Sequence, residues 1–391
     1  MRTEAVIVDV IRTPVGRGKP GGILSGVHPV DLLAGVLDAL VSRNDLDPAL
    51  VDDVIGGCVS QIGEQSYNIT RNAVLAAGFP ETVPGTTIDR QCGSSQQAAT
   101  FAAQAVMAGQ ADIVIACGVE SMSRVPLGSS AAGADPYGSR VRARYPEGLV
   151  NQGVSAELIA AKWGFSREDL DAYSARSHAL ATAAGESGAF ATEVVPVPGV
   201  ESLVDETVRP ATSVESLAGL NPAFRTDALA ERFPELDWRI TPGNSSPLTD
   251  GASAALIMSA EAASKLDLAP RARFRAFSVV GSDPLYMLTG VIPATQRVLE
   301  RAGVVIDEID AYEVNEAFAS VPLAWLKDTG ADAAKLNPRG GAIALGHALG
   351  SSGTRLLTTL VNQLEATRGR LGLQTMCEGG GMANATIIER L

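Results

Sequence analysis

The chain has 391 residues, of which 46% are hydrophobic and 19% charged, so it can bury a large core and long disordered stretches are not expected. Its net charge of −13 at pH 7 argues against nucleic acids and anionic membrane surfaces as partners. With only four cysteines a disulfide framework is excluded, which favours a reducing compartment. No run of 18 apolar residues occurs, so we expect a cytoplasmic protein without a membrane span.

Strands and helices alternate in the first part of the chain. The apolar pattern predicts a strand at 5–10, a helix at 29–42 and a buried strand at 51–59. A strand-like segment at 87–91 follows, then an Ala-rich helix that ends at Met107, and then another buried strand at 112–117. Cys92 lies directly between that segment and that helix. Continuous apolar strands that alternate with helices indicate an α/β fold with covered sheets.

The same order of elements returns near the end of the chain. The pattern predicts helices at 293–302 and near 354–366, and strands at 311–314, 371–377 and 384–389. In both parts a helix, a short acidic link and an apolar strand follow one another, which favours two duplicated halves. Residues 121–250 carry more breaks and charge, with one clear helix at 167–184, and are interpreted as an inserted loop-and-helix region.

Cys92 is a candidate nucleophile. A thiol at the N-terminus of a helix feels the positive end of the helix dipole, which favours its thiolate form. The alternative is a small buried hydrophobic side chain, as most free cysteines are.

The three histidines differ in context. His347 lies between glycines at a strand-to-helix turn, where a ring can approach a substrate closely, and a purely structural histidine is the alternative. His178 lies in the charged middle helix and is expected to be solvated. His28 precedes Pro29 and is expected to cap a helix or lie at the surface.

Two further motifs carry polar groups at strand ends. Asn315 and Glu316 follow a predicted strand, where side chains point into ligand crevices, although a helix N-cap is the alternative. Cys377 precedes glycines whose backbone N–H groups can converge on an oxyanion, although a flexible turn is the alternative. Without metal-ligand spacing or a nucleotide loop, these groups indicate covalent acyl chemistry on a thioester, with no metal site.

Over its full length the chain resembles the thiolase family. The resemblance rests on the motifs CGSSQQA at Cys92, NEAFA at Asn315, GGAIALGHALGSSG around His347, CEGGGMA at Cys377, GVESMSRVP and TPGNSSPLTDGASA. It implies a five-layered α-β-α-β-α fold of two duplicated halves. These would be residues 1–120 with 250–268, and residues 269–391, with a loop domain at 121–249 inserted in the first half.

The resemblance also implies roles for the motif residues. Cys92 would become acylated, His347 would take its proton, and Cys377 would act as acid and base at the substrate α-carbon. Asn315, through a bound water, would join His347 in one oxyanion hole. The backbone N–H groups of Cys92 and Gly379 would form the other, because an enolate and a tetrahedral adduct develop in turn.

Coenzyme A (CoA) is implied as a substrate between the loop domain and the core, with no permanently bound cofactor. Ser246 would contact the pantetheine arm and Arg209 would lie near the nucleotide end, while Met287 and Phe318 would line the tunnel. An anionic ligand also needs a local basic pocket in so acidic a chain. The resemblance further implies a homodimer or homotetramer.

Three departures from the family pattern bear on the substrate. Ala348 stands where proline is usual, Asn151-Gln152-Gly153 replaces the HMG of short-chain acetoacetyl-CoA thiolases, and Leu288 stands where glycine is usual. They favour a degradative 3-ketoacyl-CoA thiolase for fatty-acid or branched, bulky acyl β-oxidation. The alternatives are a biosynthetic acetyl-CoA acetyltransferase, a non-catalytic thiolase-like lipid or CoA carrier, and a ketoacyl synthase, which would need a second histidine after its cysteine.

Overall fold

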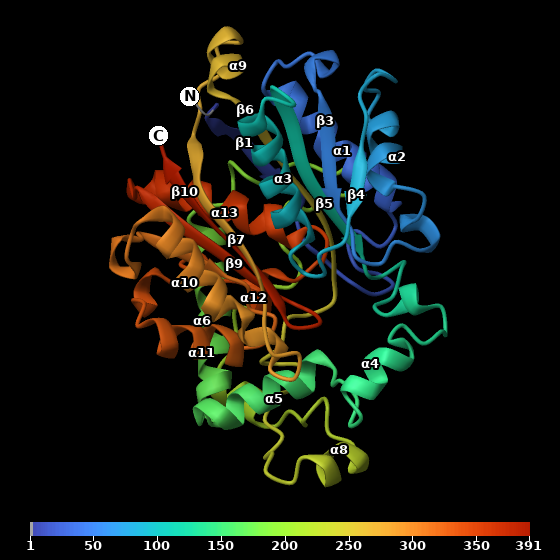
Figure 1. The fold of residues 1–391 in the computed structure, drawn as a ribbon, viewed down its shortest axis with the longest axis vertical. Coiled ribbons are helices and arrows are strands. Elements are labelled where there is room, and N and C mark those ends of the chain that lie inside the picture. The colour runs from blue at the N-terminus through green and yellow to red at the C-terminus, as the bar shows by residue number, and fades with distance from the viewer. Residues whose placement is uncertain (1–2) are drawn as a thin grey trace.

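The computed structural model describes residues 3–391 and shows two sheets with helices outside and between them (Figure 1). The first sheet contains β1 (Ala5–Arg12), β2 (Gly16–Arg17), β3 (Asp53–Gly57), β4 (Thr86–Ile88), β5 (Ile113–Ser121) and β6 (Thr249–Ser259). The second contains β7 (Ala272–Gly281), β8 (Ala311–Val314), β9 (Leu371–Glu378) and β10 (Met382–Arg390). The predicted strands are therefore present, most of them with bounds that differ by a few residues.

The two sheets have the same topology. In the first, β3 is parallel to β5, β5 antiparallel to β6, and β6 antiparallel to β1. In the second, β8 is parallel to β9, β9 antiparallel to β10, and β10 antiparallel to β7. Two residue pairs between β1 and β7 join the two sheets at a seam, so that by hydrogen bonding they form one ten-stranded sheet. The predicted duplication is confirmed by this shared order.

The helices form three layers around the sheets. They are α1 (Pro29–Arg43), α2 (Ile69–Ala76), α3 (Ser94–Ala108), α9 (Ala260–Lys265), α10 (Val291–Ala302), α11 (Ser320–Thr329), α12 (Ala342–Leu345) and α13 (Ser352–Thr367). Short 3₁₀ turns lie at Pro48–Leu50, Gly63–Gln65, Ser129–Ala131, Met287–Gly290, Ile306–Glu308 and Ala333–Lys335.

Three apolar clusters show where these helices pack. Helices α1 and α2 cover the outer face of the first sheet, α3 and α13 lie between the sheets, and α10 and α11 cover the outer face of the second (Figure 1). Ala98, Ala102 and Ala103 on α3 are fully buried, because small side chains let a helix pack closely between two sheets. The predicted five-layered α-β-α-β-α fold is confirmed.

Between β5 and β6 the chain leaves the sheets. This segment contains α4 (Gly138–Arg144), α5 (Gln152–Trp163), α6 (Arg167–Glu186), α7 (Val214–Ala218) and α8 (Asp227–Arg232), where the sequence predicted one clear helix. Helix α6 begins with a capping box in which Ser166 and Asp169 bond each other's backbone N–H groups.

Buried ion pairs fasten this segment to the first strand. Arg12 Nε lies 2.7 Å from Glu193 Oε1, and Arg12 Nη1 lies 2.7 Å from Asp205 Oδ1. All three side chains are buried, so removing one partner would leave an uncompensated charge in the interior. These two ion pairs hold the middle segment against β1.

Candidate active site

A cavity of about 720 Å³ lies where the two halves meet the middle segment. Its wall is mainly apolar and includes Val59, Met122, Leu127, Val150, Phe224, Leu248, Met287, Phe318, Leu349 and Met382. Its few polar side chains include Gln91, Gln152 and His347, and the thiol of Cys92 also lines it. This combination of an apolar wall and a few convergent polar groups is typical of a substrate site.

Cys92 lies in a tight turn between β4 and α3. Within this turn Gly93 N donates to Arg90 O and Ser94 N donates to Gln91 O, each at 3.1 Å. The turn has no room for a side chain at Gly93, because a Cβ there would lie 2.1 Å from Glu378 Oε1. The sequence therefore holds the nucleophile candidate just ahead of the first residue of α3.

The protonation state of Cys92 differs from the sequence-based expectation. The thiol is only 3% exposed, and this burial raises its pKa to about 12 in spite of a hydrogen bond from Gln152. Desolvation is the largest influence on the pKa of this thiol, which lies two residues before the start of α3. The resting side chain is a thiol and needs a base for ionisation.

His347 can act as that base. Its Nδ1 lies 2.6 Å from Ser352 Oγ, and Ser352 Oγ in turn donates to Ala348 O at 2.8 Å. Since a hydroxyl has one hydrogen, this arrangement makes Nδ1 the protonated nitrogen and leaves a lone pair on Nε2. Burial, and then the charge of Arg355, lowers the pKa of His347 to about 3, so the ring is neutral at rest.

Asn315 lies beside the unprotonated nitrogen of this ring and, in this tautomer, donates to it. Its Nδ2 lies 3.3 Å from His347 Nε2, and its Oδ1 is buried without a partner in residues 3–391. A free buried acceptor at this point is suited to an ordered water. The N-cap alternative is wrong, because α11 begins at Ser320 and its N-cap is Ala319.

Cys377 lies on β9 and is fully buried. Burial, and then the nearby Cys92 sulfur, raises the pKa of the Cys377 thiol well above its ordinary value. The chain thus places two protonated thiols near each other. Cys92 lines the cavity, whereas Cys377 is not among the residues that line it.

The glycines after Cys377 form the hairpin between β9 and β10. Gly380 and Gly381 have φ angles of +82° and +78°, which L side chains rarely adopt. Gly379 lines the cavity beside two amides, because a Cβ there would lie 3.1 Å from Gln91 Oε1 and 3.2 Å from Gln152 Nε2.

The predicted CoA contacts divide into two groups. Ser246, Met287 and Phe318 all line the large cavity. Arg209 does not, and lies in a separate small hollow of about 20 Å³ beside His178. The backbone N–H of Arg209 donates to His178 Nδ1 at 3.1 Å.

The other two histidines have structural environments. The prediction that His178 is solvated is wrong, since the side chain is 5% exposed and burial lowers its pKa to about 4. The prediction for His28 is confirmed, because its side chain accepts from Val30 N and caps α1.

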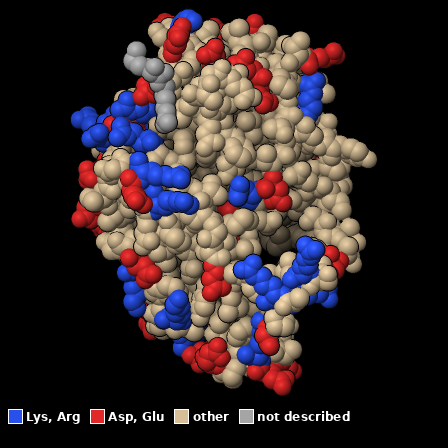
Figure 2. Space-filling model, viewed as in Figure 1, with Lys and Arg blue, Asp and Glu red and all other residues tan. Residues whose placement is uncertain are grey.

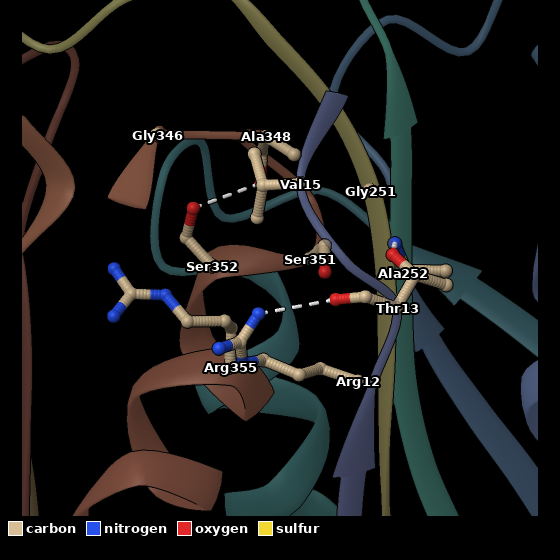
Figure 3. A pocket seen from close by; sticks show the side chains of 10 residues that line it. All are labelled: Arg12, Thr13, Val15, Gly251, Ala252, Gly346, Ala348, Ser351, Ser352 and Arg355. Carbon is tan, nitrogen blue, oxygen red and sulfur yellow. Dashed lines mark hydrogen bonds between the residues drawn. The ribbon is translucent and has the colours of Figure 1, made fainter. Parts of the chain in front are cut away.

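A second, small cavity of about 10 Å³ lies beside the loop that carries His347 (Figure 3). Its lining includes Gly346 and Ala348 on either side of the histidine, Ser352, and the buried Arg12 and Arg355. Both terminal nitrogens of Arg355 are buried without a protein partner among the described residues. The space fits about one water molecule, which is the natural partner for such donors.

Two buried glutamates, Glu120 and Glu316, brace the structure around the site. No role was predicted for Glu120, whereas Glu316 was expected to point into a ligand crevice and does not line the large cavity. Glu120 accepts from Val59 N, Ser60 N, Gln65 Nε2 and Gly350 N at 2.9 to 3.0 Å, and so ties together the loops that carry Val59 and Leu349. Glu316 accepts from Tyr173 Oη, Ser177 Oγ, Asn337 Nδ2 and Ile343 N at 2.6 to 3.1 Å. For Glu120, its position inside the motif GVESMSRVP was the only signal in the sequence.

Replacing Glu316 with alanine should lower the melting temperature by several degrees. The change removes the acceptor of four buried hydrogen bonds, and of the four donors Asn337 Nδ2 alone keeps a backbone acceptor, Val314 O, so the expected loss is about 3 kcal/mol or more. Thermal unfolding followed by circular dichroism measures the effect. Glu300→Ala, at an exposed position on α10, is the control and should leave the melting temperature unchanged. Equal melting temperatures for both variants would contradict the structural role of Glu316.

The first turn of α5 and an aromatic pair form the remaining wall. A Cβ on Gly153 would lie 2.3 Å from the ring of Phe224, so only glycine allows this contact. Phe224 in turn packs edge-on against Phe318, with ring centroids 5.8 Å apart. Sequence reasoning missed Phe224 because the segment around it has no helical or strand periodicity.

Comparisons with known proteins agree with this geometry. Residues 5–261 match the family described as "Thiolase, N-terminal domain", and residues 268–390 match "Thiolase, C-terminal domain". The chain is 49% identical to the steroid 3-ketoacyl-CoA thiolase FadA6 of Mycobacterium tuberculosis, over 100% of this chain and 95% of that protein. It is 46% identical to a 3-ketoacyl-CoA thiolase of Erwinia tasmaniensis, over 99% of this chain and 100% of that protein.

A solved structure is similar over the whole chain as well. The crystal structure of the Bacillus anthracis acetyl-CoA acetyltransferase superposes with a TM-score of 0.88 at 37% identity, covering 100% of this chain and 99% of that one. These matches account for both halves of the sequence, the five layers and the two neighbouring thiols, one of which lines the cavity: the chain belongs to the thiolase family.

Proposed function

We propose that this chain catalyses the thiolytic cleavage of a 3-ketoacyl-CoA to acetyl-CoA and a shortened acyl-CoA. The observation that carries the proposal is the arrangement around one cavity of two buried thiols, Cys92 and Cys377, and a neutral imidazole, His347. Cleavage needs one sulfur that becomes acylated and one acid that protonates the leaving carbon. A single thiol could not serve both needs, because it is esterified when the second proton transfer occurs.

The proposed first step is attack on the substrate ketone. The S–H bond of Cys92 breaks, its proton moves to His347 Nε2, and the sulfur bonds to the C3 carbon. The C2–C3 bond then breaks, Cys377 protonates C2, and acetyl-CoA leaves. A CoA thiol next attacks the acyl-enzyme, Cys377 takes the thiol proton, and the shortened acyl-CoA leaves as Cys92 regains its proton from His347.

Two oxyanions arise along this path, and different groups are proposed to stabilise them. One oxyanion would be bound by His347 and by a water that the unpaired Oδ1 of Asn315 holds. The backbone N–H groups of Cys92 and Gly379 would bind the other, since both residues line the cavity, Cys92 at the turn after β4 and Gly379 at the turn after β9.

CoA is the proposed second substrate, with Ser246, Met287 and Phe318 along its pantetheine arm. The phosphates need positive charge, and Arg209, which lies outside the cavity, is a weaker candidate than the sequence suggested. Helix α4 follows the cavity-lining Tyr137 and carries the exposed Arg140, Arg142 and Arg144. Figure 2 shows basic side chains gathered there beside a hollow in the surface.

The acyl group is proposed to be bulky and the direction degradative. In support, the cavity wall is mostly apolar, and Asn151 and Gln152 replace the histidine and methionine of the acetoacetyl-CoA pattern. The relative of 49% identity is a steroid 3-ketoacyl-CoA thiolase, whose substrate is branched and polycyclic by name. The biosynthetic alternative is favoured by one observation, the structural similarity to an acetyl-CoA acetyltransferase.

Thiolysis rates across a panel of 3-ketoacyl-CoAs test this proposal. We expect kcat/KM for long, branched or ring-bearing substrates to exceed that for acetoacetyl-CoA by at least about tenfold, which corresponds to about 1.4 kcal/mol of additional transition-state binding. Highest activity on acetoacetyl-CoA would favour the biosynthetic enzyme. No turnover of any member would favour the non-catalytic carrier.

We also propose the division into residues 1–120 with 250–268, residues 121–249, and residues 269–391, of which residues 1–2 lie outside the described range. It is supported by β5 ending at Ser121 and β6 beginning at Thr249. A cytoplasmic location is supported by four cysteines that are all free and buried. Among the described residues no helix is long and apolar enough to cross a membrane. A homodimer or homotetramer is proposed on the family resemblance.

A further inference from the structure

Gln152, the first residue of α5, brings an amide group to the candidate nucleophile. Its Nε2 lies 4.0 Å from Cys92 Sγ, at the outer limit for an N–H donor to sulfur. Within residues 3–391 this is the only hydrogen bond that the Gln152 side chain makes. The side chain is half-buried and lines the cavity, so its amide is exposed to a bound substrate.

The same amide lies beside the glycine turn after Cys377. A Cβ built on Gly379 would lie 3.2 Å from Gln152 Nε2, so the amide packs against this turn. An amide nitrogen carries two N–H groups. One can therefore donate to the Cys92 sulfur while the other faces the region between Cys92 and Gly379.

The backbone that carries Gln152 is held firmly. The Asn151 side chain accepts from Val154 N at 3.0 Å and caps α5. Further along the helix, Ser320 Oγ donates to Ala156 O at 3.0 Å and ties α5 to α11. A side chain on an anchored helix end has a fixed starting point, which is what a preorganised donor requires.

We propose that Gln152 is a catalytic residue whose amide N–H donates to the Cys92 sulfur and stabilises the negative charge that forms on it as His347 takes the proton. The proposal rests on the nucleophilic role of Cys92 in the proposed function. In this step the S–H bond breaks, the proton moves to His347 Nε2, and the electron pair left on sulfur bonds to the substrate carbonyl carbon. The amide itself takes no proton. After the acyl group has left and Cys92 is a thiol again, the amide donates to its sulfur as before.

The charge balance around the sulfur supports this role. Burial raises the pKa of Cys92, and the carboxylates of Glu378 and Glu120 raise it further. Among the groups that lower it, the Gln152 amide has the largest effect. Hydrogen bonds to a charged partner are stronger than those to a neutral one, so the amide stabilises the thiolate more than the thiol.

Alkylation of Cys92 by iodoacetamide tests the proposal without any acyl substrate. The rate at which the Cys92 peptide gains mass, measured between about pH 7 and pH 9, reports the thiolate population. Gln152→Met has a similar length and no donor, and should slow alkylation about tenfold, the change in thiolate that one pKa unit causes. Gln152→Glu adds a like charge and should slow it further.

Two controls separate this effect from misfolding. Gln110→Met replaces an exposed glutamine beyond the far end of α3 and should leave the rate unchanged. Gln152→Asn serves as a second variant if Gln152→Met unfolds at a lower temperature than the unaltered chain. It keeps the amide but on a shorter side chain, and it should also slow alkylation. Unchanged rates in folded Gln152→Met and Gln152→Asn would overturn the proposal.

Thiolysis by the same variants distinguishes this inference from the proposed function. A donor to the nucleophile should lower kcat with little change in KM, whereas a mere contact with the acyl chain would raise KM and would count against the proposal. If the unaltered chain shows no thiolysis, the proposed function fails, while the alkylation rates still decide the role of Gln152.

Discussion

Replacing Cys92 with alanine should abolish the acyl adduct that the unaltered chain forms with an acyl-CoA, seen as a missing mass increase in the intact protein. Thiolysis should fall by roughly 10⁴- to 10⁶-fold, as in other enzymes that lose a covalent nucleophile. The fold should persist, because the side chain belongs to a small apolar cluster with Met122, Leu349, Leu356 and Met376 and alanine keeps that surface apolar.

Cys117 provides the matched control for this experiment. It is a buried cysteine on β5 that does not line the large cavity. Cys117→Ala should retain the adduct and most of the thiolysis. An adduct that persists in Cys92→Ala would place the nucleophile on another side chain, and peptide mapping would identify it.

Replacing Cys377 with alanine should separate the two halves of the reaction. Acyl transfer from a simple acyl-CoA to Cys92 needs no proton at carbon, so the adduct should still form. Steps that make or break the carbon–carbon bond should slow by roughly 10²- to 10⁴-fold, as for the loss of a general acid or base. Exchange of the acetyl-CoA methyl protons with deuterium oxide should be lost in parallel.

The burial of Cys377 makes a second variant necessary. Its side chain is fully buried beside Asn315, so alanine leaves a small void near that amide. Cys377→Ser keeps the size and a hydrogen-bonding group but is a much poorer acid and base, and should behave like alanine in the exchange assay. Loss of the acyl adduct in both variants would mean that Cys377 shapes the site instead of transferring protons.

Much of the fold follows from local sequence patterns, and the middle segment shows where these patterns fail. Helices such as α10 have apolar residues at helical spacing and were predicted within two residues of their bounds. Helix α5 was missed, because its buried face includes Ser155 and Glu157. The Glu157 carboxylate accepts from Arg239 N and Ile240 N, each at 2.7 Å, so tertiary contacts replace the apolar periodicity.

The candidate site was predicted by residue type but not by protonation state. The motifs around Cys92, Asn315 and His347 come together at one site. Cys92 and Asn315 follow strands, as predicted, whereas His347 lies between α12 and α13 and not at the predicted strand-to-helix turn. Local sequence suggested a thiolate at Cys92 and a solvated His178. Both expectations were wrong for the same reason, since the degree of burial depends on segments distant in the chain, such as α5 over Cys92 and Arg209 over His178.

The burial of Cys92 also has a consequence for its stability towards oxidants. Peroxides attack thiolates and convert them to sulfenic and then to irreversibly oxidised acids. A thiol with a pKa of about 12 has a very small thiolate population at neutral pH, so the resting enzyme offers peroxide little to attack. In the proposed function the reactive anion would form only while a substrate fills the cavity, and the acyl group would then cover the sulfur until turnover is complete.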